Sequence, residues 1–131
     1  MINANYNITK IEGALWAALV GGNVITGDKL FMGSKPSSTT ATSFIVAGLA
    51  TDVMDKNAYG TYRMFVDIYA KDLGDGRKDA ATLGTLTDKI FAVLPYKAAP
   101  FYIDFYSTFS LDDGMGYHIN KIYLDCIVAQ Q

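Results

Sequence analysis

Two aspartates, Asp104 and Asp125, fall on strands that the sequence predicts to be neighbours, and such a carboxylate pair could do chemistry. Glycosidases use two carboxyl groups in this way, one as the acid and the other as the base or nucleophile. Here the pair shares a predicted sheet face with Lys121 and several tyrosines, which is also the composition of a polar protein interface. Because so small a sheet implies no deep pocket, we predict an interface, no catalytic residue and no enzymatic activity.

His118 is the only histidine and Cys126 the only cysteine of the chain. A serine or cysteine nucleophile would need His118 as its base. Eight residues along one strand separate the two side chains by about 26 Å, so they cannot form a dyad. A dyad of His118 with a serine stays open, although no sequence feature supports it. We expect a histidine at a strand end and a small, buried cysteine, and a single cysteine excludes an internal disulfide.

Two glycine-containing loops imitate ligand-binding motifs without meeting their requirements. Residues 22–29 (GNVITGDK) resemble a phosphate loop, but Asp28 stands where that motif needs lysine, and its carboxylate would repel a phosphate. The aspartates of residues 72–79 invite a calcium site, yet their spacing is not that of an EF-hand, and Arg77 and Lys78 lie among them. We therefore predict no metal site and no cofactor, and we interpret both segments as turns.

The composition restricts the classes of protein that remain. A chain of 131 residues is long enough for one domain, residues 1–131, with a substantial core. Only 18% of the residues are charged, against about 25% in an average soluble domain, which is a hint of self-association. A net charge of -2 without a run of Lys or Arg argues against binding to nucleic acid or an anionic membrane. The apolar residues 11–20 are too few for a signal peptide or transmembrane helix, so we expect a cytoplasmic protein.

The element that must position the candidate residues is a strand over residues 61–71, where apolar residues alternate with charged and aromatic ones. One face is expected to enter the core, and it consists of Tyr62, Met64, Val66, Ile68 and Ala70. The opposite face consists of Arg63, Phe65, Asp67, Tyr69 and Lys71. A sheet with one apolar face and one aromatic and charged face is expected to meet something on both sides.

Two helices flank this strand in the sequence. A capping box of Thr9 and Glu12 predicts a helix over residues 9–20. Its apolar stripe is Ile8, Ile11, Leu15 and Leu19. The second helix is expected to begin after Asp79, a good N-cap. Its apolar stripe is Leu83, Leu86, Ile90, Val93 and Leu94.

The remaining elements are strands and loops. We expect a short strand at 29–32, a polar loop at 34–43, a strand over 44–54 with a turn at 55–60, and a hairpin of strands 101–111 and 117–128. In strand 101–111, Phe109 is expected to face the same way as Phe105, and Thr108 and Ser110 the same way as Tyr106. The predicted fold is α+β, a mostly antiparallel sheet of four to five strands with both helices on one face, in the order α-β-β-β-α-β-β.

The sheet face away from the helices is the predicted interface, since exposed aromatic patches tend to be interfaces. Its members are Phe65, Tyr69, Tyr102, Asp104, Tyr106, Lys121, Tyr123 and Asp125.

This order of elements resembles the tail terminator, or tail completion, proteins of long-tailed bacteriophages. The resemblance rests on a capped helix, a short strand and polar loop (LFMGSKP, residues 30–36), and an apolar strand that opens with Phe44, Ile45 and Val46. A long hairpin, a helix and a closing hairpin follow. The resemblance covers nearly the whole chain as a pattern of elements, and it carries over no functional residue.

The resemblance implies a homo-oligomeric ring, usually a hexamer, that caps the finished tail tube and joins it to the head connector. The implied partners are further copies of the chain, the tail tube protein and a neck or connector protein, with no sequence-specific nucleic acid and no membrane. The implied location is the tail–neck junction of the virion, after synthesis in the cytoplasm of the bacterial host. Two loops fall where the family has flexible segments, and their residues are Ser34, Lys35, Pro36, Ser37, Asp75, Gly76 and Arg77.

Three alternatives stay open at this stage. Another phage neck or head–tail joining protein would have the same pattern. A small α+β domain could hold an apolar ligand between its sheet and helices without catalysis. An enzyme would have to use Asp104, Asp125 or His118.

Overall fold

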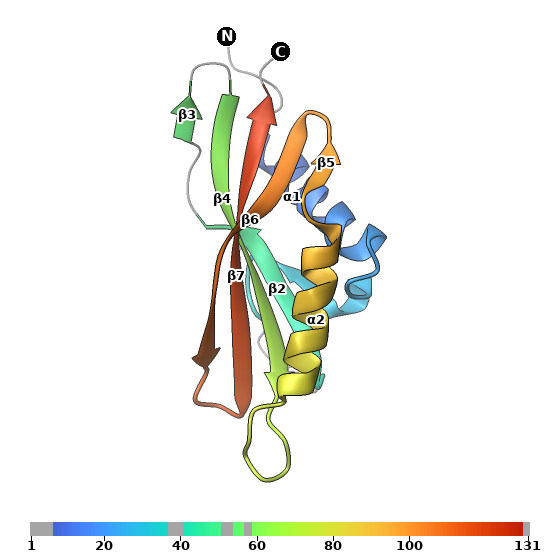
Figure 1. Ribbon diagram of the computed structural model, residues 1–131, viewed down its shortest axis with the longest axis vertical. Helices are drawn as coiled ribbons and strands as arrows, with labels where there is room; N and C mark the ends of the chain where they lie inside the picture. Colours follow the sequence, from blue (N-terminus) through green and yellow to red (C-terminus); the bar gives the residue numbers. More distant parts are fainter. Residues whose placement is uncertain (1–6, 37–40, 51–53, 57–58, 130–131) are drawn as a thin grey trace.

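The structure is a computed structural model that describes residues 7–36, 41–50, 54–56 and 59–129 (Figure 1). Its helices are α1 (Ile8–Trp16) and α2 (Ala80–Val93), with a π-helical turn (Ala17–Gly21) and a 3-10 turn (Gly27–Lys29) between α1 and the first strand. Its strands are β1 (Leu30–Met32), β2 (Ser43–Leu49), β3 (Met54–Lys56), β4 (Tyr59–Lys71), β5 (Tyr96–Ala98), β6 (Phe101–Asp112) and β7 (Tyr117–Ala129).

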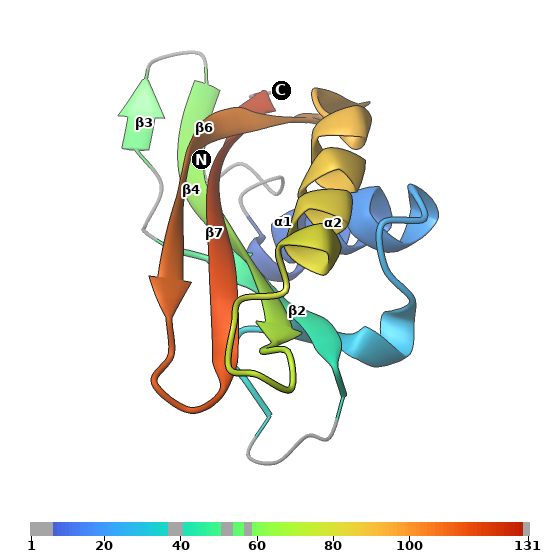
Figure 2. The same ribbon diagram turned by 60° about the horizontal axis from the view of Figure 1, so that its bottom comes forward.

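The strands form one mixed sheet that twists into a half-barrel (Figures 1 and 2). The strand order is β1-β2-β4-β7-β6-β5, and β3 pairs with β4 beyond the end of β2. Strand β1 runs parallel to β2, whereas the other described pairs are antiparallel. The two central strands, β4 and β7, pair along thirteen residues each and hold the sheet together.

The predicted fold class is wrong. In place of a mostly antiparallel sheet of four to five strands in the order α-β-β-β-α-β-β, the protein is mostly β, with seven described strands in a mixed half-barrel sheet. The order is α1-β1-β2-β3-β4-α2-β5-β6-β7, so β3 and β5 were missed. Each has three residues, too few for alternation to reveal a strand. The parallel pairing of β1 with β2 depends on the path of their connection, which alternation does not encode.

Helix α1 begins earlier than the capping box predicts. The Asn7 side chain accepts a hydrogen bond from the Thr9 amide at 3.0 Å, so Asn7 is the N-cap and the prediction of Thr9 is wrong. Asparagine caps a helix at least as well as threonine, and it stands directly before Ile8. The α-helix ends at Trp16, and the chain continues as a π-helical turn where the prediction had α-helix to residue 20. Ile8 is exposed, whereas the other members of the stripe, Ile11, Leu15 and Leu19, are buried.

Helix α2 confirms the predicted N-cap. The Asp79 carboxylate accepts from the Thr82 amide at 3.1 Å and from the Thr82 hydroxyl at 2.7 Å. These bonds favour the charged carboxylate, so they hold the pKa of Asp79 below its ordinary value. The helix then presents Leu83, Leu86 and Ile90 to the core and ends at Val93.

The core lies between the helices and one face of the sheet. The predicted inward face of β4 is confirmed, because Tyr62, Met64, Val66, Ile68 and Ala70 are all buried. The β7 members of the core are Ile122, Leu124, Cys126 and Val128. Burial raises the pKa of the Cys126 thiol to about 12, so this cysteine is a packing residue and not a reactive thiol.

Strand β6 contains an irregularity that the sequence did not predict. Its register with β7 shifts between Phe105 and Ser107, so Tyr106 is an extra residue in a bulge. Every later side chain of β6 therefore points to the opposite face from the one predicted. Phe109 pairs with Lys121 and lies near Tyr123, whereas Ser110 pairs with Asn120 on the helix side. The faces predicted for Phe109, Thr108 and Ser110 are therefore wrong.

Candidate functional site

The structure brings the eight predicted interface residues together on one face of the sheet. They come from β4 (Phe65, Tyr69), β6 (Tyr102, Asp104, Tyr106) and β7 (Lys121, Tyr123, Asp125), three strands that are neighbours in the sheet. We call this face, which is turned away from the helical core, the open face. By strand register the open face also carries Phe44, Arg63, Asp67, Phe109, Leu111, Tyr117 and Ile127.

Arg63 of β4 contacts side chains of β7 and β6 on the open face. Its Nε lies 2.8 Å from Oδ1 of Asp125, and its guanidinium carbon lies 3.4 Å from the centre of the Tyr106 ring. Burial alone would lower the pKa of Arg63, but Asp125 and Tyr106 outweigh it and leave that pKa above its ordinary value. The Asp125 carboxylate is therefore neutralised within the molecule.

A second ion pair occupies the middle of the open face. The Lys121 ammonium lies 3.3 Å from Oδ2 of Asp67 and within 5.1 to 5.5 Å of the rings of Phe65 and Tyr123. Asp67 is only 8% exposed, and burial raises its pKa although Lys121 opposes the shift. The Oδ1 atom of Asp67 has no hydrogen-bond partner among the described residues, so Lys121 is what stabilises the buried charge.

An aromatic cluster closes the end of the open face next to β2. The Phe44 ring is stacked on Tyr69 at 4.6 Å and meets Tyr117 edge-on at 5.7 Å. Lys35 lies over the rings of Tyr69 and Tyr117 and 3.6 Å from Asp113. Tyr69 is thus part of the packing between strands, which leaves the region around Tyr106 and Tyr123 as the more accessible part of the face.

The polar loop before β2 is held against the β6–β7 turn. In addition to the Lys35 ion pair, the Tyr117 hydroxyl donates to the Ala41 carbonyl oxygen at 2.8 Å. Ser34 and Pro36 lie beside Lys35, and the predicted loop residue Ser37 lies outside the described residues.

The second predicted loop is a tight turn at the lower end of Figure 1, between β4 and α2. Gly76 adopts a positive φ of 83°, and its amide donates to the Leu73 carbonyl oxygen. Arg77 donates to the Asp75 carboxylate from both its backbone and its side chain. These local bonds make the turn compact, and Asp75, Gly76 and Arg77 are exposed.

The residues considered for catalysis occupy structural positions. Asp104 and Asp125 are direct cross-strand partners, but Asp125 is bound to Arg63, and Asp104 accepts from the Phe105 amide at 2.8 Å. His118 has its Nδ1 2.6 Å from Asp72 and its Nε2 3.8 Å from Asp112. His118, near the start of β7, therefore contacts one carboxylate just after β4 and another at the end of β6, and links the ends of these strands.

Exposed large apolar side chains gather on the hairpin of β6 and β7. Among the described residues ten such side chains are exposed, and five belong to residues 105–115 of this hairpin: Phe105, Tyr106, Phe109, Leu111 and Met115. Tyr106 is 53% exposed and Phe109 43%. The sequence analysis missed Phe109 and Leu111 because the bulge inverts their faces. The predicted list of interface residues leaves out Arg63 and Asp67, although the sequence analysis places both on the same face of the strand as Phe65 and Tyr69.

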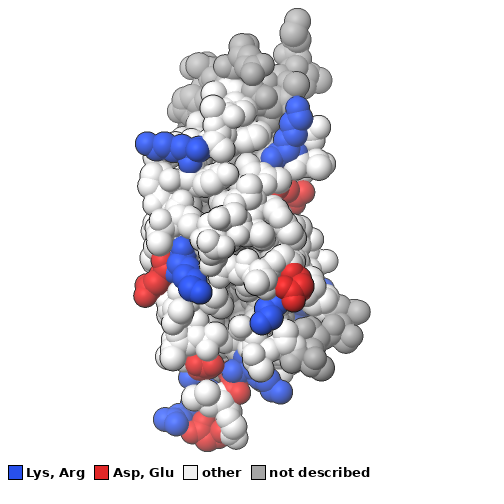
Figure 3. Space-filling model, turned by 90° about the vertical axis from the view of Figure 1, so that its right-hand side faces the viewer, with Lys and Arg blue, Asp and Glu red and all other residues white. Residues whose placement is uncertain are grey.

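The helix side of the molecule has a different surface. Figure 3 shows charged side chains scattered over a mostly uncharged surface, with lysines or arginines beside acidic groups in its middle and at its lower end. No described helix is long and apolar enough to span a membrane. The described residues also contain no cluster of three or more side chains that could hold a metal ion.

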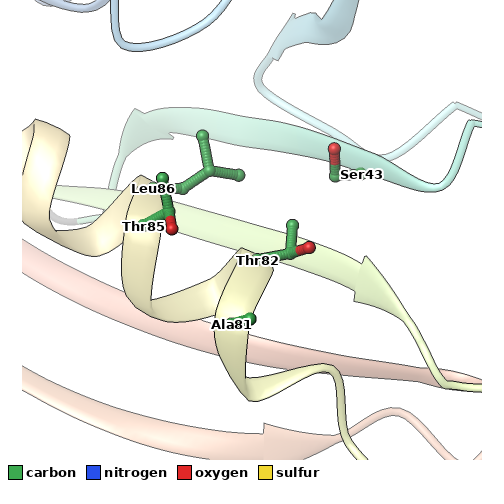
Figure 4. A pocket seen from close by; sticks show the side chains of 5 residues that line it. All are labelled: Ser43, Ala81, Thr82, Thr85 and Leu86. Atoms are coloured by element: carbon green, nitrogen blue, oxygen red, sulfur yellow. The ribbon is translucent and has the colours of Figure 1, made fainter.

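Two of the shallow pockets that border helix α2 lie between this helix and the sheet. One lies between α2 and the start of β2, has a volume of about 280 Å³, and is lined by Ser43, Ala81, Thr82, Thr85 and Leu86 (Figure 4). The other lies between α2 and β6, has a volume of about 390 Å³, and is lined by Phe91, Leu94, Asp104, Phe105 and Thr108. Both are open to solvent, and neither enters the core.

Comparison with protein-family models and with curated proteins finds no match to this chain. The function must therefore be argued from the surface itself.

Proposed function

We propose that the chain is a structural subunit that assembles with copies of itself into a ring, of the tail-terminator type that its sequence resembles. In that role the ring caps a phage tail tube and joins it to the head connector, at the tail–neck junction of the virion. Its partners are further copies, the tail tube protein and the neck protein. The proposal includes no catalysis and no cofactor.

One observation carries this proposal: the open face and the β6–β7 hairpin expose aromatic and apolar side chains, while four of the charged groups on the open face form two ion pairs. Arg63 is paired with Asp125, and Lys121 with Asp67. A surface with neutralised charge and exposed aromatic rings is suited to protein contact, because little unpaired charge has to be desolvated. It does not favour a phosphate-rich ligand, which needs unpaired lysines or arginines.

A ring needs a heterologous contact, in which two different surfaces of one subunit meet around a closed rotation. The hairpin side of the molecule and the helix side differ in composition, since five of the ten exposed large apolar side chains among the described residues belong to residues 105–115 and three to the helices. Such unlike surfaces support head-to-tail assembly. A neck or head–tail joining subunit would use the same surfaces.

The alternative of an apolar ligand between sheet and helices has less support. The side chains there are packed together, and Met64, Leu83 and Ile90 are at most 1% exposed. A ligand would have to displace core residues, which costs several kcal/mol, roughly 2 to 5 per large side chain.

Mass in solution tests the proposal, with negative-stain imaging of the same sample. We expect a closed ring of roughly six copies. Tyr106→Ser and Phe109→Ser should shift the mass towards the monomer, because both remove exposed apolar surface from the proposed contact. Leu73→Ser is the matched control, since Leu73 is equally exposed but lies on the β4–α2 turn. Unchanged assembly in both hairpin variants would contradict the placement of the contact.

A further inference from the structure

The second half of strand β6, residues 107–112, is an edge that no described strand covers. Strand β5 pairs only with residues 101–103 of β6, whereas β7 pairs with the other side of β6 along almost its whole length. In Figures 1 and 2 this half of β6 is the outermost strand on its side of the sheet. Residues 108–112 are exposed on both faces of the strand, so little of this segment is packed against other described elements.

This edge lacks the lysines and prolines that protect many edge strands from pairing. Residues 107–111 are Ser, Thr, Phe, Ser and Leu, and the first charged side chain after them is Asp112. Phe109 is 43% exposed and Leu111 40%. An exposed and uncharged edge with apolar side chains is a template for pairing with another strand.

The same segment of a second copy is a geometrically suitable partner. A twofold axis perpendicular to the sheet makes two copies of one edge strand antiparallel, and it keeps the open faces of both copies on the same side. Within residues 107–112 no bulge interrupts the alternation, because the register shift with β7 lies before Ser107. Apolar side chains of the two copies can therefore meet on the open face, and polar side chains on the helix side.

We propose that the β6 edges of two copies pair across such a twofold axis, with Ser110 of one copy opposite Ser110 of the other. On the open face, Phe109 of each copy then lies opposite Leu111 of the other copy. On the helix side, Thr108 of each copy lies opposite Asp112 of the other copy. This contact is isologous, so it goes beyond the heterologous contact of the proposed ring and joins copies that belong to different rings.

The side chains select this register from its neighbours. A shift by one residue would bring opposite faces together, so the next possible registers differ by two residues. In one of them the bulge brings Asp112 opposite Phe105, and in the other Asp113 lies opposite Phe109. Both of these registers place a carboxylate against an aromatic ring, whereas the proposed register places Phe109 against Leu111.

Charge adds to this complementarity. Lys78 donates to the Ser110 hydroxyl at 3.1 Å and forms no ion pair with a described residue. The side chain of Asp112 is 62% exposed. In the proposed register Asp112 of the second copy is a diagonal neighbour of Ser110, so its carboxylate comes within reach of the Lys78 ammonium.

The contact is short, so two isolated copies should associate weakly through it. In the proposed ring every copy offers the same edge to a copy of a second ring, and contacts made together raise the overall affinity. We therefore expect single rings at low protein concentration and pairs of rings, with twice the mass, at high concentration. This doubling rests on the proposed ring, whereas the edge pairing itself does not.

Two substitutions at Thr108 test the pairing, because this side chain points away from the open face. Thr108→Asp places a carboxylate opposite Asp112 of the second copy, whereas Thr108→Lys places an ammonium there. Both variants lose the hydrogen bond from the Thr108 hydroxyl to the Lys121 carbonyl oxygen, so their comparison isolates the sign of the charge. Since the twofold axis repeats the pair, Thr108→Asp should weaken the pairing about tenfold at low salt, and Thr108→Lys should strengthen it about as much.

Sedimentation equilibrium over a range of protein concentrations measures these changes. Thr85→Asp and Thr85→Lys, at an exposed threonine of α2, are the matched controls and should leave the pairing unchanged. A native mass that never exceeds one ring, or a pairing that does not respond oppositely to the two Thr108 variants, refutes the edge pairing and leaves the ring standing. A native dimer whose affinity follows the charge at Thr108 supports the edge pairing and refutes the ring. A chain that stays monomeric at all concentrations refutes both proposals.

Discussion

Replacing Lys121 by methionine should destabilise the protein strongly and in a way that depends on pH. The substitution keeps the aliphatic stem against Phe65 and Tyr123 but removes the ammonium that lies 3.3 Å from Asp67. Asp67 then becomes a buried carboxylate whose Oδ1 already lacks a hydrogen-bond partner in the part of the chain that the structure describes. Its charged form loses the main interaction that stabilises it.

The size of the effect follows from the burial of the pair. Breaking a fully buried ion pair by removing one partner costs about 3–5 kcal/mol. Because the side chain of Lys121 is 21% exposed and that of Asp67 12%, water screens part of the remaining charge. We therefore expect the free energy of unfolding to fall by about 2–3 kcal/mol at pH 7.

The pH dependence has a definite sign. Burial raises the pKa of Asp67 in the folded state, and removal of Lys121 should raise that pKa further. A raised carboxylate pKa means that the folded state loses stability as the pH rises from the unfolded pKa through the folded one. The deficit of the variant should be complete at pH 7 and shrink as the pH falls below the raised pKa of Asp67.

Urea unfolding at fixed protein concentration, followed from pH 7 down to the acid range, measures this deficit. The double variant Asp67→Val, Lys121→Met removes both charges and should recover most of the loss, since an apolar pair can replace a buried ion pair. Lys97→Met is the control, because Lys97 lies over Tyr102 and forms no ion pair with a described carboxylate. A deficit that is absent, independent of pH, or not relieved in the double variant would refute the role assigned to Lys121.

Three further predictions concern other parts of the fold. Asp79→Ala removes the N-cap of α2 and should lower the melting temperature at pH 7. Because the folded state lowers the pKa of Asp79, the stability that this carboxylate contributes is present above the ordinary aspartate pKa and is lost as the pH falls through the lowered pKa. The melting temperatures of wild type and variant should therefore converge in acid. Cys126, with its pKa raised to about 12, should react with thiol reagents at pH 8 only as fast as the protein opens, and labelling at the rate of a free thiol would refute its burial. Tyr117→Phe removes the hydrogen bond to the Ala41 carbonyl and should cost about 1 kcal/mol in urea unfolding, whereas no loss would show that this contact does not hold the loop.

The sequence predicted those elements whose own residues carry the signal. Helix α2 was found from an aspartate N-cap and an apolar stripe, and both are local features of the chain. Strand β4 was found from an alternation long enough to distinguish its two faces. The eight open-face residues share a face because alternation holds within each uninterrupted strand. Strands β1, β3 and β5 have three residues each, so their pairing with a neighbouring strand, and not their own sequence pattern, defines them. Of these three, the sequence predicted only β1.

By itself the sequence determined which side chains alternate along β4, β7 and the first part of β6, and therefore which polar and aromatic residues share the open face. Only the tertiary structure decided the rest. The bulge at Tyr106 inverts the faces of the residues after it, because one extra residue shifts a period of two. The pairing of Arg63 with Asp125 and of Lys121 with Asp67 depends on strand order, which local patterns do not contain. The open edge of β6 exists because the half-barrel does not close, and closure is a property of the whole sheet.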